Sequence, residues 1–161
     1  SSNKFMWGVS LGGLVCYEVT KNSNFDCRGV MFMVPAFGTP EGLGQVKEED
    51  FPKLISKNPE YFDKRNEFPK GCDGESAMAM FSYAKNNSFE FHTYNSPFQL
   101  FIAGTDKMVP PLNQYAIFEE AKSQDKEVKY YPDAWHGFFI EEEYFEAVKA
   151  NLKWLNSKLR I

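Results

Sequence analysis

Two compact apolar runs set the strongest limit on the fold that this chain can adopt. Val30–Val34 is apolar at every position and lies between Gly29 and Pro35, and Phe98–Ala103, apolar at all but one position, ends at Gly104. Runs of this kind are typical of parallel strands that are covered on both faces. Because helices must then lie on both sides of the sheet, the two runs predict an α/β fold with a mostly parallel sheet.

Helical patterns alternate with these runs along the chain. A short strand at Phe5–Trp7 precedes helical spacing over 11–19, and a helix over 111–122, a short strand at Val128–Tyr131 and a helix over 141–158 close the sequence. The apolar residues that we expect the last two helices to bury are Leu112, Tyr115, Ile117 and Phe118, and then the stripe Phe145, Val148, Leu152, Leu155 and Leu159.

The middle of the chain, residues 41–96, has a different character. It is rich in glycine, proline and charged residues, and only two short helices are predicted there, around 49–56 and 75–85. A long insertion without strands is more often a lid than a part of the sheet. We therefore expect one α/β core, formed by residues 1–40 and 97–161, with a lid inserted between them.

Charge and cysteine content narrow the function classes. Eighteen Lys+Arg against 22 Asp+Glu give a net charge of −4, which makes general nucleic-acid binding an unfavourable interpretation. No apolar run is long enough to span a bilayer, and no secretory signal is visible at the N-terminus. Cys16, Cys27 and Cys72 form no CxxC pair and cannot all be bridged, which favours a reducing compartment. A cytoplasmic or peripheral membrane location is the resulting expectation.

Gly8–Gly12 matches G-x-S-x-G, the pattern of a nucleophile elbow, in which a sharp turn from a strand into a helix exposes a serine hydroxyl. The match lies between an apolar strand and a helical pattern, which is the context that the motif requires. Gly8 and Gly12 are expected to lack side chains because strand and helix approach too closely for a Cβ atom. The Leu11 amide is then expected to donate to an oxyanion. The alternative is a glycine-rich turn in which Ser10 is incidental.

A serine nucleophile needs a base, and the base needs an orienting acid. His136 lies between the last predicted strand and helix, at the strand end that would face Ser10, whereas His92 lies in the variable middle and is interpreted as a surface or lid residue. Asp106 follows a predicted strand at its carboxyl end. Asp133 follows a proline, and Pro-Asp is a common turn pair, so Asp106 is the predicted acid.

Ser10, Asp106 and His136 follow one another in the order of the α/β-hydrolase triad. No dinucleotide-binding or phosphate-binding glycine motif is present, and the few His and Cys have no metal-ligand spacing, so neither a cofactor nor a metal is expected. The acidic run Glu141–Glu143 is interpreted as a solvated charge cluster at a helix start.

Several segments together resemble the lid-bearing α/β-hydrolases of the monoacylglycerol lipase and lysophospholipase group. They are Trp7–Gly13, Met33–Ala36, Pro97–Val109, Phe118–Lys126, Tyr131–Pro132, Trp135–Gly137 and Trp154–Leu155. The resemblance implies Ser10 as nucleophile, Asp106 as acid, His136 as base and residues 41–96 as a lid that gathers acyl chains. Dienelactone hydrolases share the His-Gly-Phe ending but lack such an insertion and usually carry a cysteine nucleophile, so they are the second choice.

The resemblance also implies partners. The family carries roughly four further strands and an oxyanion donor ahead of the elbow, whereas seven residues precede Gly8 here. We therefore expect the C-terminal half of a hydrolase, whose strand at Phe5–Trp7 needs a partner from the missing N-terminal half or a complementary chain. A lipid-like ester is the expected substrate, and the lid is expected to contact a membrane surface. The aromatic residues expected in the lid are Phe51, Tyr61, Phe62, Phe68, Phe81 and Tyr83.

Two functions remain open from the sequence. The first is a serine hydrolase that cleaves carboxylic esters of monoacylglycerols or lysophospholipids through an acyl-enzyme. The second is a hydrolase-derived subunit without catalytic activity that serves a structural or interaction role in a larger assembly. A complete set of triad residues favours the first, and the missing half favours the second.

Overall fold

The computed structural model describes residues 3–21, 25–38, 50–58, 79, 82–86 and 89–159. The elements, in chain order, are β1 (Phe5–Val9), α1 (Leu11–Thr20), β2 (Gly29–Met33), α2 (Phe51–Ile55), the 3-10 turn η4 (Phe91–Thr93), β3 (Phe98–Ala103), α5 (Pro111–Glu120), β4 (Lys126–Tyr131), the 3-10 turn η5 (Phe138–Ile140) and α6 (Glu143–Leu159). This alternation confirms the predicted α/β class.

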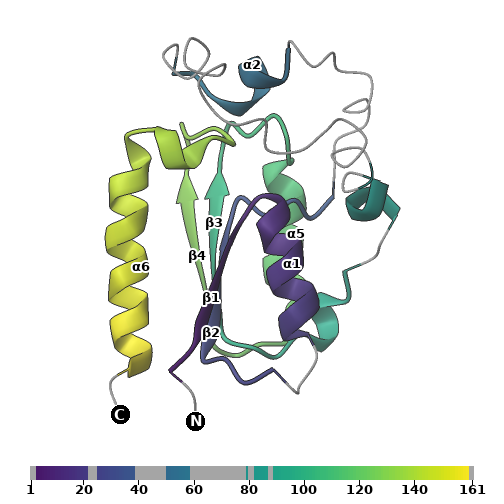
Figure 1. Cartoon of the computed structure of the whole chain (residues 1–161), viewed down its shortest axis with the longest axis vertical. Helices are drawn as coiled ribbons and strands as arrows, with labels where there is room; N and C mark the ends of the chain where they lie inside the picture. The colour runs from purple at the N-terminus through teal and green to yellow at the C-terminus, as the bar shows by residue number, and fades with distance from the viewer. Residues whose placement is uncertain are drawn as a thin grey trace.

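The four strands form one parallel sheet in the order β1-β2-β3-β4. Phe5 of β1 is opposite Gly29, Val30 of β2 is opposite Phe98, and Phe98 of β3 is opposite Lys126. Helix α6 covers one face of the sheet, and α1 and α5 cover the other (Figure 1). All carboxyl strand ends therefore lie along one edge, and α2 lies beyond that edge.

Each face of the sheet carries its own apolar core. On the α1 and α5 side, aromatic rings dominate, and Phe91 packs against Tyr17 at 4.7 Å and against Phe37 at 5.0 Å between ring centroids. On the α6 side, Phe101 and Phe138 are fully buried. Burial of both faces explains why the β2 and β3 sequences are apolar rather than alternating.

The predicted buried face of α6 is wrong. The residues of α6 that are buried are Ala147 and Trp154, whereas Phe145 is 72% exposed and Leu152 is 55% exposed. The Trp154 ring occupies the space above Gly29, where a Cβ atom would lie 2.5 Å from it. The bulky indole over a glycine thus sets the rotation of the helix. Leu112, also expected in the core, is 77% exposed on α5.

Part of the expected lid falls within the described residues. Helix α2 and the helical residues 82–86 correspond to the two predicted short helices. Tyr83 donates a hydrogen bond to Glu18 Oε1 of α1 at 2.7 Å. Tyr61, Phe62, Phe68, Phe81 and Cys72, and the side chain of Phe51, lie outside the described residues. None of the helices in the described ranges is long and apolar enough to cross a membrane.

A buried hydrogen bond joins α1 to the segment ahead of β3. The Thr20 hydroxyl donates to Cys16 O at 2.6 Å, so the Tyr94 hydroxyl, 2.7 Å away, donates to Thr20 Oγ1. Burial raises the pKa of Tyr94 above its ordinary value. The phenol is therefore protonated at neutral pH, where it acts as a neutral donor.

Tyr94→Phe is expected to lower the free energy of unfolding by about 1 kcal/mol, because one buried hydrogen bond is lost while Thr20 keeps its bond to Cys16. Urea denaturation measures the change. Tyr130→Phe is the matched control, because Tyr130 is 48% exposed and its hydroxyl can bond water. Equal effects of the two substitutions would contradict the role assigned to the Thr20–Tyr94 bond.

Candidate active site

Ser10 occupies a strained turn between β1 and α1. Its backbone has φ 51° and ψ −120°, in the left-handed half of the map that non-glycine residues avoid. Three backbone hydrogen bonds hold it there: its N–H donates to Met33 O at 3.0 Å, and its carbonyl accepts from Gly13 N at 2.9 Å and Ala36 N at 3.0 Å. The turn presents the Ser10 side chain at the carboxyl edge of the sheet, as the elbow motif predicts.

Strain at this position can be measured. The free energy of unfolding of Ser10→Gly is expected to be about 1 kcal/mol higher than that of Ser10→Ala, so the glycine variant is the more stable one. The reason is that relief of a strained backbone, worth about 1–3 kcal/mol, exceeds the extra unfolded-state entropy of glycine. Both variants lose the hydroxyl, so their difference isolates the backbone. Chemical denaturation gives the two values, and an alanine variant as stable as the glycine variant would show that the turn carries no strain.

Gly8 and Gly13, rather than Gly8 and Gly12, are the glycines that close packing requires. A Cβ atom at Gly8 would lie 2.3 Å from Gly12 O, and one at Gly13 would lie 2.6 Å from Pro35 Cβ. No described atom lies within 4 Å of a Cβ built at Gly12. The expectation for Gly12 is therefore wrong for the described structure: its backbone lies against Gly8 of β1, but a Cβ atom on Gly12 would point away from the strands into open space.

Asp106 lies in the turn after β3, with its carboxylate fully buried. Its Oδ1 atom accepts from the backbone N–H groups of Met108 at 2.8 Å and Val109 at 2.9 Å. These bonds fix the carboxylate and leave Oδ2 directed at the imidazole of His136, whose Nδ1 lies 2.9 Å away. A buried carboxylate with backbone donors on one oxygen is a rigid acceptor for a single partner.

His136 connects the acid to the serine. It lies in the loop after β4, and its Nε2 atom is 2.8 Å from Ser10 Oγ while Nδ1 faces Asp106. Because a carboxylate can only accept, Nδ1 carries the proton donated to Asp106. The Nε2 lone pair therefore accepts from the Ser10 hydroxyl. The structure thus brings together the three predicted residues, which are 96 and 30 positions apart in the sequence.

The competing residues lie elsewhere. His92 is on the surface, where its Nδ1 is 3.2 Å from Glu120 Oε1. The side chain of Asp133 is exposed, as its interpretation as a turn residue implies. Leu11, the predicted oxyanion donor, is the first residue of α1 and directly follows Ser10. Its amide has no carbonyl four residues earlier within the helix and is oriented out of the helix N-terminus.

Glu141 was missed by sequence analysis, and the interpretation of Glu141–Glu143 as a solvated cluster is wrong for its first member. Glu141 is 6% exposed and accepts from the backbone N–H of Trp135, next to His136, at 3.0 Å. A signal was present in the sequence, because apolar Phe138–Ile140 directly precede the acid. Phe138 in this apolar turn is fully buried, and a glutamate directly after such a turn is more readily buried than the later members of the acidic run.

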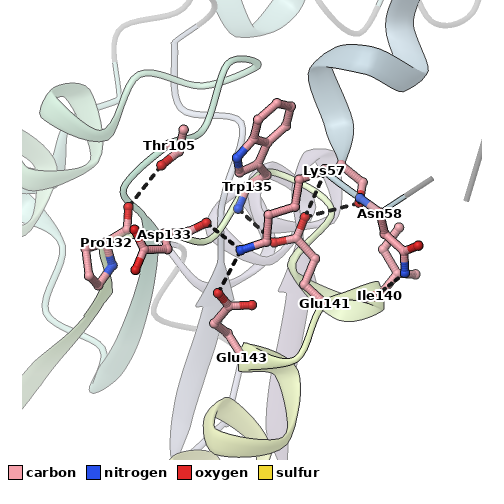
Figure 2. Close-up of polar contacts among 10 residues, drawn as sticks. Lys57, Asn58, Thr105, Pro132, Asp133, Trp135, Ile140, Glu141 and Glu143 are labelled. Carbon is pink, nitrogen blue, oxygen red and sulfur yellow. Dashed lines mark hydrogen bonds and ion pairs between the residues drawn. The ribbon is translucent and has the colours of Figure 1, made fainter. Parts of the chain in front are cut away.

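The Asp106 and His136 loops also touch through their neighbours. The Lys107 ammonium lies 3.8 Å from the centroid of the Trp135 ring, within the range of a cation–π contact. Thr105 N donates to Ala134 O at 3.0 Å, and the Thr105 hydroxyl donates to Pro132 O at 3.0 Å (Figure 2). Within the described ranges no group of three or more His, Cys, Asp or Glu could hold a metal ion.

A parallel sheet with helices on both faces, and a serine, a histidine and an aspartate joined at its carboxyl edge, define an α/β hydrolase. The chain belongs to the Hydrolase_4 family, described as serine aminopeptidase, S33, whose family model matches residues 1–143. No curated protein matches the sequence.

Solved structures show the same fold. The crystal structure of a Paleococcus ferrophilus monoacylglycerol lipase has a TM-score of 0.72 and 26% identity, and the match covers 96% of this chain and 68% of that one. A soluble variant of monoglyceride lipase from Saccharomyces cerevisiae, in complex with a substrate analog, has a TM-score of 0.74 and 18% identity, covering 96% and 64%. A bromoperoxidase from Bacillus anthracis has a TM-score of 0.78 and 14% identity, covering 96% and 68%. The chain therefore spans about two thirds of the length of these proteins.

Proposed function

We propose that this α/β hydrolase cleaves carboxylic esters of lipid type, such as monoacylglycerols or lysophospholipids, with Ser10 as nucleophile, His136 as base and Asp106 as orienting acid. The observation that carries the proposal is the continuous line of hydrogen bonds from Ser10 Oγ through the His136 ring to the Asp106 carboxylate. The likeness to a monoacylglycerol lipase at 26% identity supports the same reaction class.

The reaction follows from which atoms hold protons. Ser10 Oγ attacks the ester carbonyl while its proton moves to His136 Nε2, and Asp106 stabilises the resulting imidazolium. The Leu11 amide donates to the oxyanion of the tetrahedral intermediate. His136 then protonates the leaving alcohol, which leaves an acyl-enzyme on Ser10. Water, deprotonated by His136, releases the fatty acid and restores the serine hydroxyl.

The lipid-type substrate is supported by an apolar cavity beside the elbow. The cavity has a volume of about 290 Å³ and is lined by Leu11, Leu14, Val15, Glu18, Val19 and Tyr83. It begins at Leu11, the residue after the nucleophile, and follows the outer side of α1. An aliphatic acyl chain attached to Ser10 would gain about 0.8 kcal/mol for each methylene that it buried there.

The proposal is tested by reaction with a fluorophosphonate, which modifies an activated serine, followed by peptide mass spectrometry. A single adduct on Ser10 is expected, together with release of fatty acid from a monoacylglycerol or a lysophospholipid. If Ser10 is modified but only short water-soluble esters are hydrolysed, the assignment as a serine hydrolase stands and the assignment of a lipid-type substrate is wrong. A Ser10 that stays unmodified even when the strand that completes the sheet is supplied would reject the hydrolase itself.

A non-catalytic, hydrolase-derived subunit is the second candidate, and the edge of β1 favours it. Among the described strands β1 pairs with β2 alone, and Trp7 on this strand is 49% exposed. An open strand edge pairs readily with a further strand. This candidate expects Ser10 to stay unmodified even when the strand that completes the sheet is present, whereas the hydrolase expects that strand to increase the rate of modification.

A further inference from the structure

The loop that carries His136 is bonded, on both sides of the histidine, to the last residue of α2 and the residues that follow it. We call residues Ile55–Lys57 the α2 tail. On one side, Gly137 N donates directly to Ile55 O at 2.6 Å. On the other, Trp135 N donates to Glu141 Oε2 at 3.0 Å, and Glu141 Oε1 in turn accepts from the tail. The backbone N–H groups of the residues before and after His136 are thus both held, directly or through Glu141, by the same short segment.

Glu141 is the junction of this arrangement, as the sticks in Figure 2 show. Its Oε1 atom accepts from Ser56 Oγ at 3.1 Å and from Lys57 N at 3.3 Å, while Oε2 accepts from Trp135 N. A buried carboxylate is retained only where donors replace its water, and here both oxygens have them. The bonds connect two segments that are nearly 80 residues apart in the sequence.

Lys57 closes the same connection at the surface. Its ammonium donates to Asp133 O at 2.8 Å and to Glu143 Oε1 at 3.0 Å (Figure 2). Burial alone would lower the pKa of Lys57, but the bond to Glu143 and the nearby Glu141 and Asp133 outweigh it, so the pKa is raised. The ammonium therefore stays charged, and the tail contacts the chain before and after His136.

The tail also fits against the loop without spare room. A Cβ atom built at Gly137 would lie 2.9 Å from Ile55 O, 3.0 Å from Ile55 Cγ2 and 3.2 Å from Ser56 Cβ. The residue after His136 is therefore a glycine because the tail passes directly over it. Any displacement of the tail moves the backbone on which the imidazole is mounted.

We infer that Glu141 is a positioning residue for His136 and that it couples the orientation of the imidazole to the α2 tail. The inference rests on the proposed function, since it gives His136 the role of base. No hydrogen bond joins Glu141 to Ser10 or Asp106 in the described structure; Glu141 holds the backbone N–H of Trp135, the residue before His136, so that Nε2 stays 2.8 Å from Ser10 Oγ. A misplacement of about 1 Å at such a group can lower the rate about 100-fold.

The chemistry of Glu141 suggests a graded set of variants. Glu141→Ala removes all three bonds. In Glu141→Gln the side-chain carbonyl oxygen can still accept from Trp135 N and the NH₂ group can donate to Ser56 Oγ, so that only the hydrogen bond from Lys57 N is lost. In Ser56→Ala the carboxylate still accepts hydrogen bonds from Trp135 N and Lys57 N. Glu142→Gln is the matched control, because Glu142 is the exposed neighbour in the same acidic run.

Steady-state hydrolysis of a short soluble ester gives the first readout. We expect kcat to fall about 100-fold in Glu141→Ala and about 3- to 10-fold in Glu141→Gln and Ser56→Ala, with KM within twofold of the parent. KM is unaffected because Glu141 does not touch the substrate. A general loss of folded protein would lower the active fraction, which titration with the fluorophosphonate counts, and would not lower kcat per active site.

The second readout does not depend on activity. The chain has two histidines, and the exposed His92 serves as an internal reference for the nitrogen-attached protons of a ¹⁵N-labelled sample. The His136 Nδ1–H resonance is shifted downfield by its bond to Asp106. Relative to the parent, we expect this resonance to move or broaden most in Glu141→Ala and less in Glu141→Gln, while the His92 resonances stay fixed. If Glu141→Ala does not fold, Glu141→Gln and Ser56→Ala decide the question.

An unchanged His136 resonance and a kcat within twofold of the parent in the folded variants would overturn the inference. The failure of the proposed function gives a different pattern. In that case the parent protein is not modified at Ser10, yet the His136 resonance still reports whether Glu141 holds the loop. The two outcomes are therefore separable in one set of samples.

Discussion

Replacing Ser10 with alanine is expected to abolish fluorophosphonate labelling and to lower kcat for ester hydrolysis on the order of 10⁶-fold, the scale of loss when a triad nucleophile is removed. The side-chain bond of Ser10 in the structure is the one to His136 Nε2, and its three backbone bonds are unaffected by the change. The chain is therefore expected to fold as before. Labelling, turnover and the circular dichroism spectrum measure the three quantities separately.

Ser157→Ala is the matched control for this experiment. Ser157 lies on α6, away from the carboxyl edge of the sheet, and its hydroxyl bonds only within the helix, to Trp154 O at 2.6 Å. This variant is expected to be labelled and to turn over ester at the parent rate. Hydrolysis that persists in Ser10→Ala would mean that another group performs the chemistry.

Gly8→Ala is expected to lower the free energy of unfolding by about 3 kcal/mol or more and to abolish activity with it. A Cβ atom at this position would lie 2.3 Å from Gly12 O, 2.5 Å from Gly12 C and 2.7 Å from Gly13 N, all of them backbone atoms of α1. Backbone atoms cannot move aside as a flexible side chain does, so the strand and helix must separate. Separation would carry Ser10 away from His136. Chemical denaturation and fluorophosphonate labelling measure both effects.

Gly12→Ala provides the comparison within the same motif. Gly12 is helical, and no described atom would contact the new methyl group, so the change is expected to raise the free energy of unfolding by about 0.5–1 kcal/mol. If both variants lost stability equally, the close approach of β1 and α1 would not be what distinguishes the two glycines.

The strands and the three site residues could be predicted from the sequence for one physical reason. A strand covered on both faces is apolar at nearly every position, which marked Val30–Val34 and, apart from Gln99, Phe98–Ala103. Parallel strands place their carboxyl ends along one edge, so residues that follow such strands converge. Ser10, Asp106 and His136 each follow a strand directly or by a short loop, and their meeting is a consequence of topology.

Features that depend on the shape of neighbouring elements could not be predicted in this way. The stripe on α6 that includes Phe145 and Leu152 has helical spacing, but the fit of Trp154 over Gly29 decided which side of the helix faces the sheet. Glu141 belongs to an acidic run, and the composition of such a run predicts exposure to solvent. Its burial is instead made possible by hydrogen-bond donors in the α2 tail, about 85 positions earlier in the sequence. Spacing along one element contains no information on such partners.

The left-handed turn at Ser10 has a consequence for any attempt to make this protein more heat-resistant. A screen that ranks variants by melting temperature would favour glycine at this position, since it removes the backbone cost, and would thereby discard the hydroxyl. Val34, which follows the neighbouring strand β2, also has a positive φ of 41°, but its side chain is fully buried, so glycine there would lose apolar packing. Selection for robustness and selection for turnover therefore act in opposite directions at Ser10, and a screen should score both from its first round.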